Sequence, residues 1–318
     1  PMLTLSDIYE AQKRLSPYVF RTPVIRLKTL DEALHCKVYV KAENMQKINA
    51  FKIRGALNKA LQLSPETLKN GIVTASSGNH GRGVAFAGKL LGVPVTVVMP
   101  EHAPEVKKAA IKALGAEIVL CEKSQRFVIA ERITKEKGAC FIHPFDDYDV
   151  MAGQGTAGLE MMNQLPKVDK IVVPVGGGGL ISGIATAVKG TRDSVKVYGA
   201  EPALCARYTE SFKKGEPTLV TIGDTIADGT MTAKPGEKTF PIVREKVDGI
   251  IPVEEKFIHR AVKLLLLEGK ILAEPSSCMT LGAALQGALP VKEDDNVIFF
   301  LSGGNVDLSL IEKICAEK

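Results

Sequence analysis

The chain has 318 residues, long enough for two domains of ordinary size. Hydrophobic residues make up 45% of it and charged residues 24%, a composition typical of a globular enzyme. The net charge of +5 is spread over mixed-sign segments such as Arg244-Glu245-Lys246-Val247-Asp248, so nucleic acid is not an expected partner. The apolar run at residues 264–267 is interrupted by Glu268 and Lys270, far short of the roughly 20 residues that span a bilayer, so we do not expect a membrane protein.

The cysteines and the N-terminus indicate the compartment. There is no CxxC pair, no regular cysteine spacing and no signal-peptide pattern, so we expect reduced thiols in the cytoplasm. The six cysteines are Cys36, Cys121, Cys140, Cys205, Cys278 and Cys315. Pro1 before Met2 resembles the remnant of a cleaved tag, which makes Met2 the expected natural start.

Helical and strand-like segments alternate along the chain. The first helix is expected at residues 5–15, with Ser6 or Asp7 as its N-cap, and Arg21-Thr22-Pro23-Val24 is expected to be extended. Further strands are expected at 38–43, 72–75, 93–99, 117–120, 140–142, 170–175, 195–199 and 296–301. Further helices are expected to begin at Lys52 and to cover 81–91, 107–114, 127–137, 158–163 and 180–188. Apolar strands separated by helices predict α/β architecture with parallel sheets covered on both faces.

The alternation of strands and helices stops and restarts near residue 147. Two successive α/β units predict a small domain at residues 47–146, inserted into a larger domain built from residues 1–46 and 147–318. The sequence contains no repeat of fixed period, low-complexity tract or linker.

Lys52 is a candidate nucleophile. It follows Phe51 and starts a helix just after an apolar strand. An amine held in a partly desolvated pocket can condense with a carbonyl group. Most lysines are solvated surface charges, so Lys52 becomes a candidate through the glycine-rich and serine-rich turns that follow it.

Four successive glycines follow the strand at 170–175 and precede a helix: Gly176, Gly177, Gly178 and Gly179. Their backbone N–H groups at a helix start suit a phosphate, and a tight turn is the alternative. The run does not match the G-x-x-x-x-G-K-[ST] loop. It also fails the G-x-G-x-x-G spacing, because Ser182 stands where the third glycine belongs. A lone phosphate therefore fits better than a dinucleotide.

Two more turns carry polar groups. Ser76-Ser77-Gly78-Asn79-His80-Gly81 lies between a strand and a helix, where hydroxyl, amide and N–H groups suit a carboxylate; a plain N-cap with a glycine hinge is the alternative. Ser302-Gly303-Gly304-Asn305 follows the last strand, at the end where open α/β sheets bind ligands.

These motifs, with Ala152-Gly153-Gln154-Gly155-Thr156, Ile226-Ala227-Asp228-Gly229 and Glu274-Pro275, resemble the pyridoxal-phosphate enzymes of the serine/threonine dehydratase and serine racemase family over essentially the whole chain. The resemblance implies pyridoxal 5'-phosphate as cofactor and a homodimer. It also implies the two-domain fold type II architecture, similar to the β subunit of tryptophan synthase, in which each domain is a mostly parallel sheet flanked by helices.

By this resemblance, Lys52 would hold the cofactor covalently and then act as base at the substrate Cα. The other implied cofactor contacts are Phe51 on the ring, Asn79 on the 3-hydroxyl oxygen, Gly176, Gly177, Gly178 and Gly179 around the phosphate, and Ser302 at the pyridine nitrogen. The substrate carboxylate would bind Ser76, Ser77, Gly78, Asn79 and His80.

The implied reaction removes water from L-threonine or L-serine and gives a 2-oxo acid and ammonia. A serine rather than a carboxylate at position 302 leaves the ring a weaker electron sink, which favours prompt loss of a β-hydroxyl. The chain ends after the catalytic unit, so we expect no feedback inhibition by isoleucine.

Four positions depart from the common dehydratase pattern. Ser77 matches serine racemases, where its hydroxyl lies opposite the lysine and can return a proton, so serine racemisation is the alternative reaction. Glu201 of the divalent-cation site is present, but Arg207 replaces the expected Asp. The Arg207 guanidinium could pair with Glu201, so a bound cation is doubtful.

Ala50 replaces a serine that often precedes Phe-Lys. Arg82 replaces a glutamine; it would accept a second carboxylate, as in 3-hydroxyaspartate, if it points inward, although a solvent-facing orientation is expected.

Three other functions compete with this reading. A β-replacement enzyme such as cysteine synthase would usually read Thr-Ser-Gly-Asn-Thr-Gly in the substrate loop, so His80 disfavours it. A nicotinamide-dependent oxidoreductase is disfavoured by the failed glycine spacing. A non-catalytic ligand-binding homologue is disfavoured by the intact Lys52.

Overall fold

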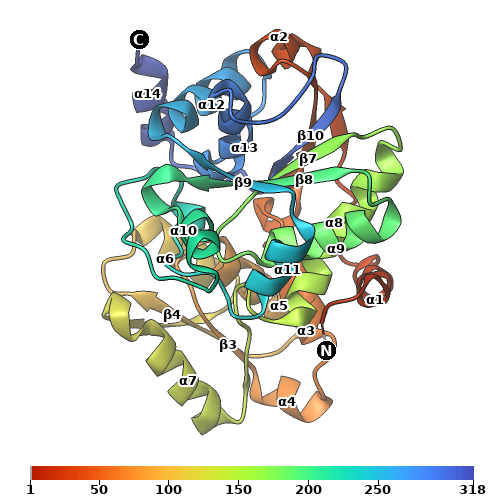
Figure 1. Ribbon diagram of the computed structural model, residues 1–318. Coiled ribbons are helices and arrows are strands. Elements are labelled where there is room, and N and C mark those ends of the chain that lie inside the picture. Colours follow the sequence, from red (N-terminus) through yellow and green to blue (C-terminus); the bar gives the residue numbers. More distant parts are fainter. Residues whose placement is uncertain (1) are drawn as a thin grey trace.

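The computed structural model describes residues 2–318, so the interpretation of Pro1 as a tag remnant lies outside the described residues. Within residues 2–318, ten strands form two sheets (Figure 1). The larger sheet has the order β1 (Val24–Arg26), β2 (Lys37–Ala42), β10 (Asn296–Leu301), β7 (Lys170–Pro174), β8 (Lys196–Pro202) and β9 (Gly249–Val253). All its neighbouring strands are parallel except β1 and β2.

The smaller sheet is entirely parallel. Its order is β5 (Glu117–Cys121), β4 (Val95–Pro100), β3 (Ile72–Ala75) and β6 (Cys140–Phe141). The central strands β3 and β4 are fully buried, as expected for parallel strands covered on both faces, whereas the edge strand β5 is mostly accessible. The expected α/β class with mostly parallel sheets is confirmed.

Helices cover both sheets. They are α1 (Leu5–Leu15), α2 (Asp31–Leu34), α3 (Lys52–Ala60), α4 (Pro65–Asn70), α5 (Asn79–Leu91), α6 (Glu105–Ala113), α7 (Arg126–Lys137), α8 (Tyr148–Gln164), α9 (Gly179–Thr191), α10 (Arg207–Lys214), α11 (Thr239–Lys246), α12 (Glu255–Leu267), α13 (Pro275–Leu285) and α14 (Leu308–Ala316). Among the described residues, no helix is both long and apolar enough to cross a membrane.

Strand β10 shows how the larger sheet builds its core. Alternate side chains of a strand point to opposite faces. Phe299 and Leu301 pack on one side with residues of α12 and α13, and Ile298 and Phe300 pack on the other with residues of α9. The sheet is therefore buried on both faces, which fixes the position of the loop after β10.

The main corrections concern helix starts and the C-terminal third. The first helix has the expected bounds, but its N-cap is Thr4 instead of Ser6 or Asp7. The Thr4 hydroxyl accepts from the Asp7 backbone N–H at 3.2 Å, and the Asp7 carboxylate accepts from the Thr4 N–H at 2.9 Å. The helix expected at 158–163 is the second half of α8. Strand β9 and helices α10 to α14 had no sequence prediction.

Candidate active site

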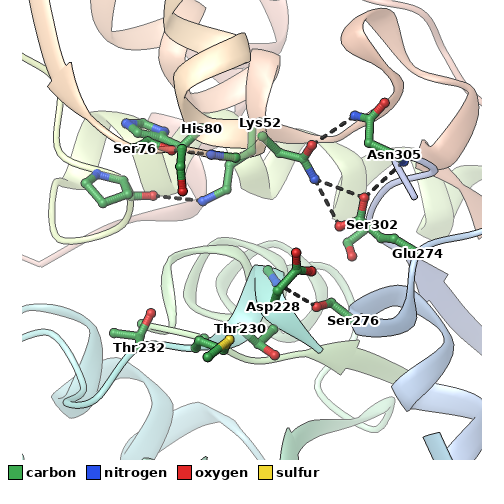
Figure 2. A pocket seen from close by; sticks show the side chains of 18 of the residues that line it. Lys52, Ser76, His80, Asp228, Thr230, Thr232, Glu274, Ser276, Ser302 and Asn305 are labelled. Atoms are coloured by element: carbon green, nitrogen blue, oxygen red, sulfur yellow. Dashed lines mark hydrogen bonds between the residues drawn. The ribbon is translucent and has the colours of Figure 1, made fainter. Parts of the chain in front are cut away.

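A cavity of about 810 Å³ lies where strands of both sheets end. Loops that follow β3, β7 and β10 line it, together with the start of α3. Lys52, the Ser76 to His80 loop, the four glycines and Ser302 all belong to its wall, so the structure brings the predicted site residues into one pocket. Figure 2 shows Lys52, Glu274 and Ser302 on one side and Thr230 and Thr232 on the facing side.

Lys52 is the first residue of α3, as predicted. The residue before it is fixed to the end of β10, because the Phe51 N–H donates to the Ser302 carbonyl at 3.0 Å. The Lys52 Nζ lies 3.4 Å from the Pro144 carbonyl oxygen and 5.3 Å from the centre of the Phe51 ring. Burial lowers the pKa of Lys52 from 10.5 to about 8, against the opposing charge of Glu274. About a tenth of this amine is therefore uncharged at pH 7, compared with less than about 0.1% for a lysine with the ordinary pKa of 10.5.

The four glycines form a cradle of free donors. Within residues 2–318, none of the N–H groups of Gly176, Gly177, Gly178 and Gly179 donates a hydrogen bond to the protein. A Cβ at Gly177 would lie 2.3 Å from the Phe145 ring, and Gly178 has a φ of 103°. No larger residue fits there, and free N–H groups at the start of α9 match the acceptors of a phosphate. The residues present therefore fit the phosphate of pyridoxal phosphate.

The Ser76 to His80 loop precedes and opens α5. The Gly78 N–H donates to the Ser76 hydroxyl at 3.1 Å, and Ser76 and Ser77 both line the cavity. The Asn79 side chain donates to the two Glu274 oxygens at 3.0 and 3.1 Å and accepts from the Asn305 side chain at 2.9 Å. Its proposed contact with the cofactor hydroxyl stays a prediction.

The His80 side chain is buried, and within residues 2–318 only one of its two ring nitrogens forms a hydrogen bond with another protein group. Its Nε2 lies 2.9 Å from the Ile142 carbonyl, which can only accept, so Nε2 carries the proton. Burial, reinforced by the charge of Lys52, lowers the pKa of His80 well below 6.5. Its Nδ1 has no hydrogen-bond partner among the described residues. The ring is therefore neutral, with a free acceptor.

Sequence reasoning gave no role to Glu274, which lines the cavity, or to Ser277, which contacts the cavity residue Ser302. Burial raises the pKa of Glu274 to about 7, although hydrogen bonds from the Asn79 side chain and the Asn305 N–H favour the charged form. Ser277 lies in α13 with its hydroxyl oxygen 3.0 Å from that of Ser302. Because the Gly303 N–H also donates to the Ser277 oxygen at 2.8 Å, Ser277 fixes the position of Ser302. The Glu274-Pro275 motif was the available signal for this segment.

Arg207 occupies the position where a carboxylate was expected. The side chain is completely buried and donates to the carbonyls of Val175 at 2.6 Å and Gly176 at 3.2 Å. It also contacts Glu201 at 3.4 Å, so the predicted pair is present. Further carbonyl acceptors are those of Thr230 and Thr232. Among residues 2–318, no cluster of three His, Cys, Asp or Glu side chains could hold a metal ion.

Arg82 and Ala50 complete the positions that depart from the family pattern. Arg82 is partly buried and lines the cavity, so the solvent-facing orientation expected from the sequence is not the one observed. Ala50 forms an isolated antiparallel bridge with Gly303, which again connects the segment before Lys52 with the loop after β10.

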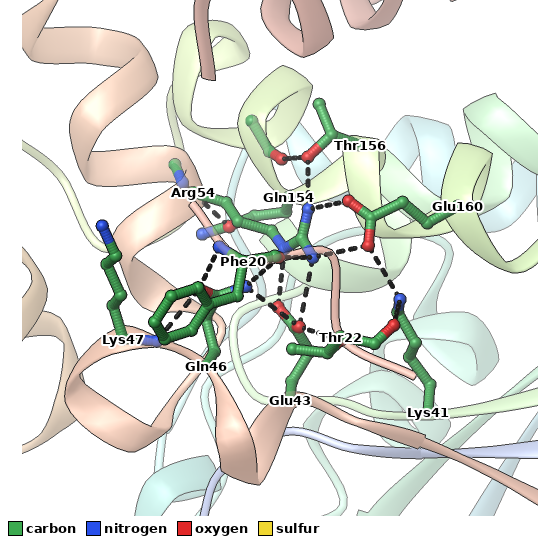
Figure 3. A network of polar contacts seen from close by, with 12 residues as sticks. Phe20, Thr22, Lys41, Glu43, Gln46, Lys47, Arg54, Gln154, Thr156 and Glu160 are labelled. Carbon is green, nitrogen blue, oxygen red and sulfur yellow. Dashed lines mark hydrogen bonds and ion pairs between the residues drawn. The ribbon is translucent and has the colours of Figure 1, made fainter. Parts of the chain in front are cut away.

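A buried polar network holds α3 in place, and sequence reasoning missed it (Figure 3). Arg54 donates to Glu43 at 2.6 Å and to Glu160 at 2.7 Å, and Lys41 donates to Glu160 at 2.8 Å. The two positive charges of the network equal its two negative charges. The Thr156 hydroxyl also accepts a hydrogen bond from Arg54 at 3.0 Å. The network joins α3 to β2 and α8 at Arg54, two residues beyond Lys52.

Comparisons with known proteins agree with this arrangement. Residues 15–303 match the family model described as pyridoxal-phosphate dependent enzyme. The chain is 44% identical to an L-threonine ammonia-lyase of Geobacter sulfurreducens over 315 residues, which cover 98% of this chain and 78% of the relative. It is 42% identical to a catabolic L-threonine dehydratase of Staphylococcus aureus, with 98% and 92% covered. The structure of maize serine racemase superposes with a TM-score of 0.94 at 38% identity and covers 98% of this chain and 97% of its own.

Proposed function

The chain belongs to the family of pyridoxal-phosphate dependent enzymes, and from this premise we propose that it removes water from L-threonine or L-serine, giving a 2-oxo acid and ammonia. The observation that carries the proposal is a lysine of lowered pKa in the same pocket as a cradle of free N–H groups. Relatives named for threonine ammonia-lyase and threonine dehydratase activity support the choice of reaction.

Each residue has a proposed task. Gly176, Gly177, Gly178 and Gly179 hold the cofactor phosphate, Phe51 packs on the ring, and Ser302 and Asn79 contact the pyridine nitrogen and the 3-hydroxyl oxygen. Bound pyridoxal phosphate supplies an electron sink that acidifies the substrate Cα proton. Lys52, which also attaches the cofactor, takes that proton while Ser76, Ser77, Gly78, Asn79 and His80 hold the substrate carboxylate. The β-hydroxyl then leaves as water.

The test is a product assay on purified protein loaded with pyridoxal phosphate. We expect 2-oxo acid and ammonia from L-threonine or L-serine, and a loss of at least about a thousandfold in Lys52→Ala, which removes both the attachment point and the base. Formation of neither product from either substrate would refute the proposed reaction.

Racemisation of serine is the second candidate, favoured by Ser77 in the pocket wall. A hydroxyl opposite Lys52 would return a proton to the other face of Cα and invert it. Ser77→Ala should then abolish D-serine formation while 2-oxo acid formation from L-serine continues. Equal loss of both products would exclude Ser77 from this role.

We also propose a homodimer in the cytoplasm. The dimer rests on resemblance to the family, and sedimentation of the purified protein tests it. The compartment is supported by six cysteines that are all free, two of which, Cys205 and Cys278, are fully buried.

A further inference from the structure

Two arginines line the pocket without a carboxylate partner. Arg82 on α5 and Arg126 at the start of α7 are both partly buried and both belong to the cavity wall. Within the described part of the chain, no Asp or Glu oxygen lies within 4.0 Å of either guanidinium. A partly desolvated charge is unfavourable unless it is paired. Two such charges facing one cavity indicate a ligand that supplies the negative group.

Among the described residues, three carboxylates line the same pocket, and two of them, Glu274 and Asp228, are engaged elsewhere; the third, Asp307, is exposed and contacts neither arginine. Glu274 accepts hydrogen bonds from Asn79 and from the Asn305 N–H, and Asp228 lies 3.4 Å from Lys107. Arg82 acts on Glu274 through its charge, without an ion-pair contact. Arg126 donates from Nε to the Lys123 carbonyl at 3.0 Å, which leaves the end of its guanidinium available. Within the described part of the chain, the positive charges of Arg82 and Arg126 therefore have no carboxylate in contact with them on this wall of the pocket.

Helix geometry relates Arg82 to the proposed substrate loop. Arg82 lies one turn into α5, and its N–H donates to the Gly78 carbonyl at 3.2 Å. Side chains of a helix lean toward its N-terminus, and at Arg82 this is the end of α5 that carries the loop. A substrate whose α-carboxylate lies at the loop would present its side chain to Arg82.

We propose that Arg82 and Arg126 bind an anionic group on the side chain of the substrate. This proposal rests on the proposed lyase function and adds to its substrates β-substituted amino acids with a second negative group, which the enzyme would prefer to threonine. That group is either a side-chain carboxylate, as in 3-hydroxyaspartate, or a phosphate ester at the β position, as in O-phosphoserine.

Both substrates undergo a balanced elimination. Lys52 takes the Cα proton and the Cβ–O bond breaks, with its electron pair leaving on oxygen. From the diacid the oxygen gains a proton and leaves as water; from the phosphate ester it leaves as phosphate. In each case one water then hydrolyses the enamine, which releases ammonia and a 2-oxo acid.

Substrate kinetics test the proposal. We would measure kcat/KM for L-threonine, L-threo-3-hydroxyaspartate and O-phospho-L-serine in the wild type, Arg82→Gln and Arg126→Gln, with Arg132→Gln as matched control. Arg132 lies on α7 outside the cavity, with an exposed side chain. In Arg82→Gln the kcat/KM ratio of the preferred anionic substrate to threonine should fall by about ten- to a hundredfold, the size of a lost charge-assisted hydrogen bond. Arg126→Gln should lower it in the same direction, and Arg132→Gln should leave it unchanged.

The two anionic substrates distinguish a carboxylate site from a phosphate site. If Arg82→Gln changes the kcat/KM ratio of each anionic substrate to threonine by less than about twofold from the wild type, the proposal is overturned.

Binding of L-aspartate, which has no β-leaving group, separates this proposal from the lyase function. Calorimetry should show that L-aspartate binds more tightly than L-alanine and about tenfold more weakly to Arg82→Gln. Absence of product from every substrate, with this binding intact, would refute the lyase function alone; equal binding of aspartate and alanine would refute the anion site.

Discussion

The amine of Lys52 is the group whose protonation controls attachment of the cofactor. Burial lowers its pKa from 10.5 to about 8, and the uncharged form is the nucleophile. Covalent attachment to the cofactor-free protein should therefore accelerate as the pH rises through about 8 and level off above about pH 9, where the amine is mostly neutral.

This pH profile is measured by stopped-flow absorbance after pyridoxal phosphate is mixed with the cofactor-free protein between about pH 6.5 and 10.5. The free amino acid derivative Nα-acetyl-lysine is the control, and its rate should keep rising across the whole range. A protein profile that also rises without levelling would show that the pocket does not lower the pKa of Lys52.

Arg207 provides a built-in positive charge beside the phosphate cradle. It contacts Glu201 and the carbonyls of Val175 and Gly176, so it fills the space between the cradle and Glu201. We propose that it takes the place of the divalent cation that the family resemblance implies for this site. Activity of the wild type should therefore change by less than about twofold on chelation, because the guanidinium is covalently part of the chain.

Arg207→Asp provides the matched comparison for this prediction, because it restores a carboxylate six positions after Glu201. Its activity should fall on chelation and recover at least in part with magnesium. A marked loss in the wild type that magnesium reverses would contradict the built-in cation. Activity assays with and without chelator, at constant ionic strength, make the comparison.

At the scale of elements, α3 carries Lys52 and is held by charges that come from distant segments. Arg54 pairs with Glu43 after β2 and with Glu160 on α8, and all three side chains are buried. Removing one partner of a buried pair leaves an uncompensated charge, at a cost of about 3–5 kcal/mol. Arg54→Met should lower the free energy of unfolding by that amount.

Urea denaturation of the cofactor-free protein measures this loss without interference from bound ligand. Arg132→Met is the control, because Arg132 is exposed and 3.9 Å from Glu136, a contact of less than about 1 kcal/mol. Similar losses in both variants would mean that the Arg54 network adds no more stability than a surface ion pair.

Local signals account for what the sequence predicted well. Short stretches of sequence contain the signals for a strand, for a polar or glycine-rich turn and for the start of a helix. The turns around Ser77, Gly177 and Ser302 and the helix start at Lys52 could therefore be predicted. The partners of Arg54 and Ser302 were missed because each pair joins residues far apart in sequence, such as Arg54 with Glu160 and Ser302 with Ser277. Periodicity carries no information about such pairs. The cap at Thr4 was missed because two local hydrogen bonds, between Thr4 and Asp7, decide which of several nearby polar residues caps the helix.

At the scale of the molecule, the pocket joins the two sheets. The strands of the smaller sheet lie within residues 72–141 and those of the larger sheet outside that range. The division into residues 47–146 and residues 1–46 plus 147–318 stays our proposal. Under it, Lys52 and Asn79 belong to the small domain, and the glycine cradle and Ser302 belong to the large one. A cofactor bound to all of them would connect the domains.

This arrangement predicts that pyridoxal phosphate stabilises the whole fold. A ligand that binds the native state at about 100 times its dissociation constant adds about 2.7 kcal/mol, which for a chain of this size raises Tm by about 5 °C. Scanning calorimetry of cofactor-free and loaded protein measures the shift. Lys52→Ala should lose at least about half of it, since the covalent bond is absent, and inorganic phosphate alone should give a smaller shift because it occupies only the cradle. Equal Tm values with and without pyridoxal phosphate would mean that the cofactor does not connect the two domains.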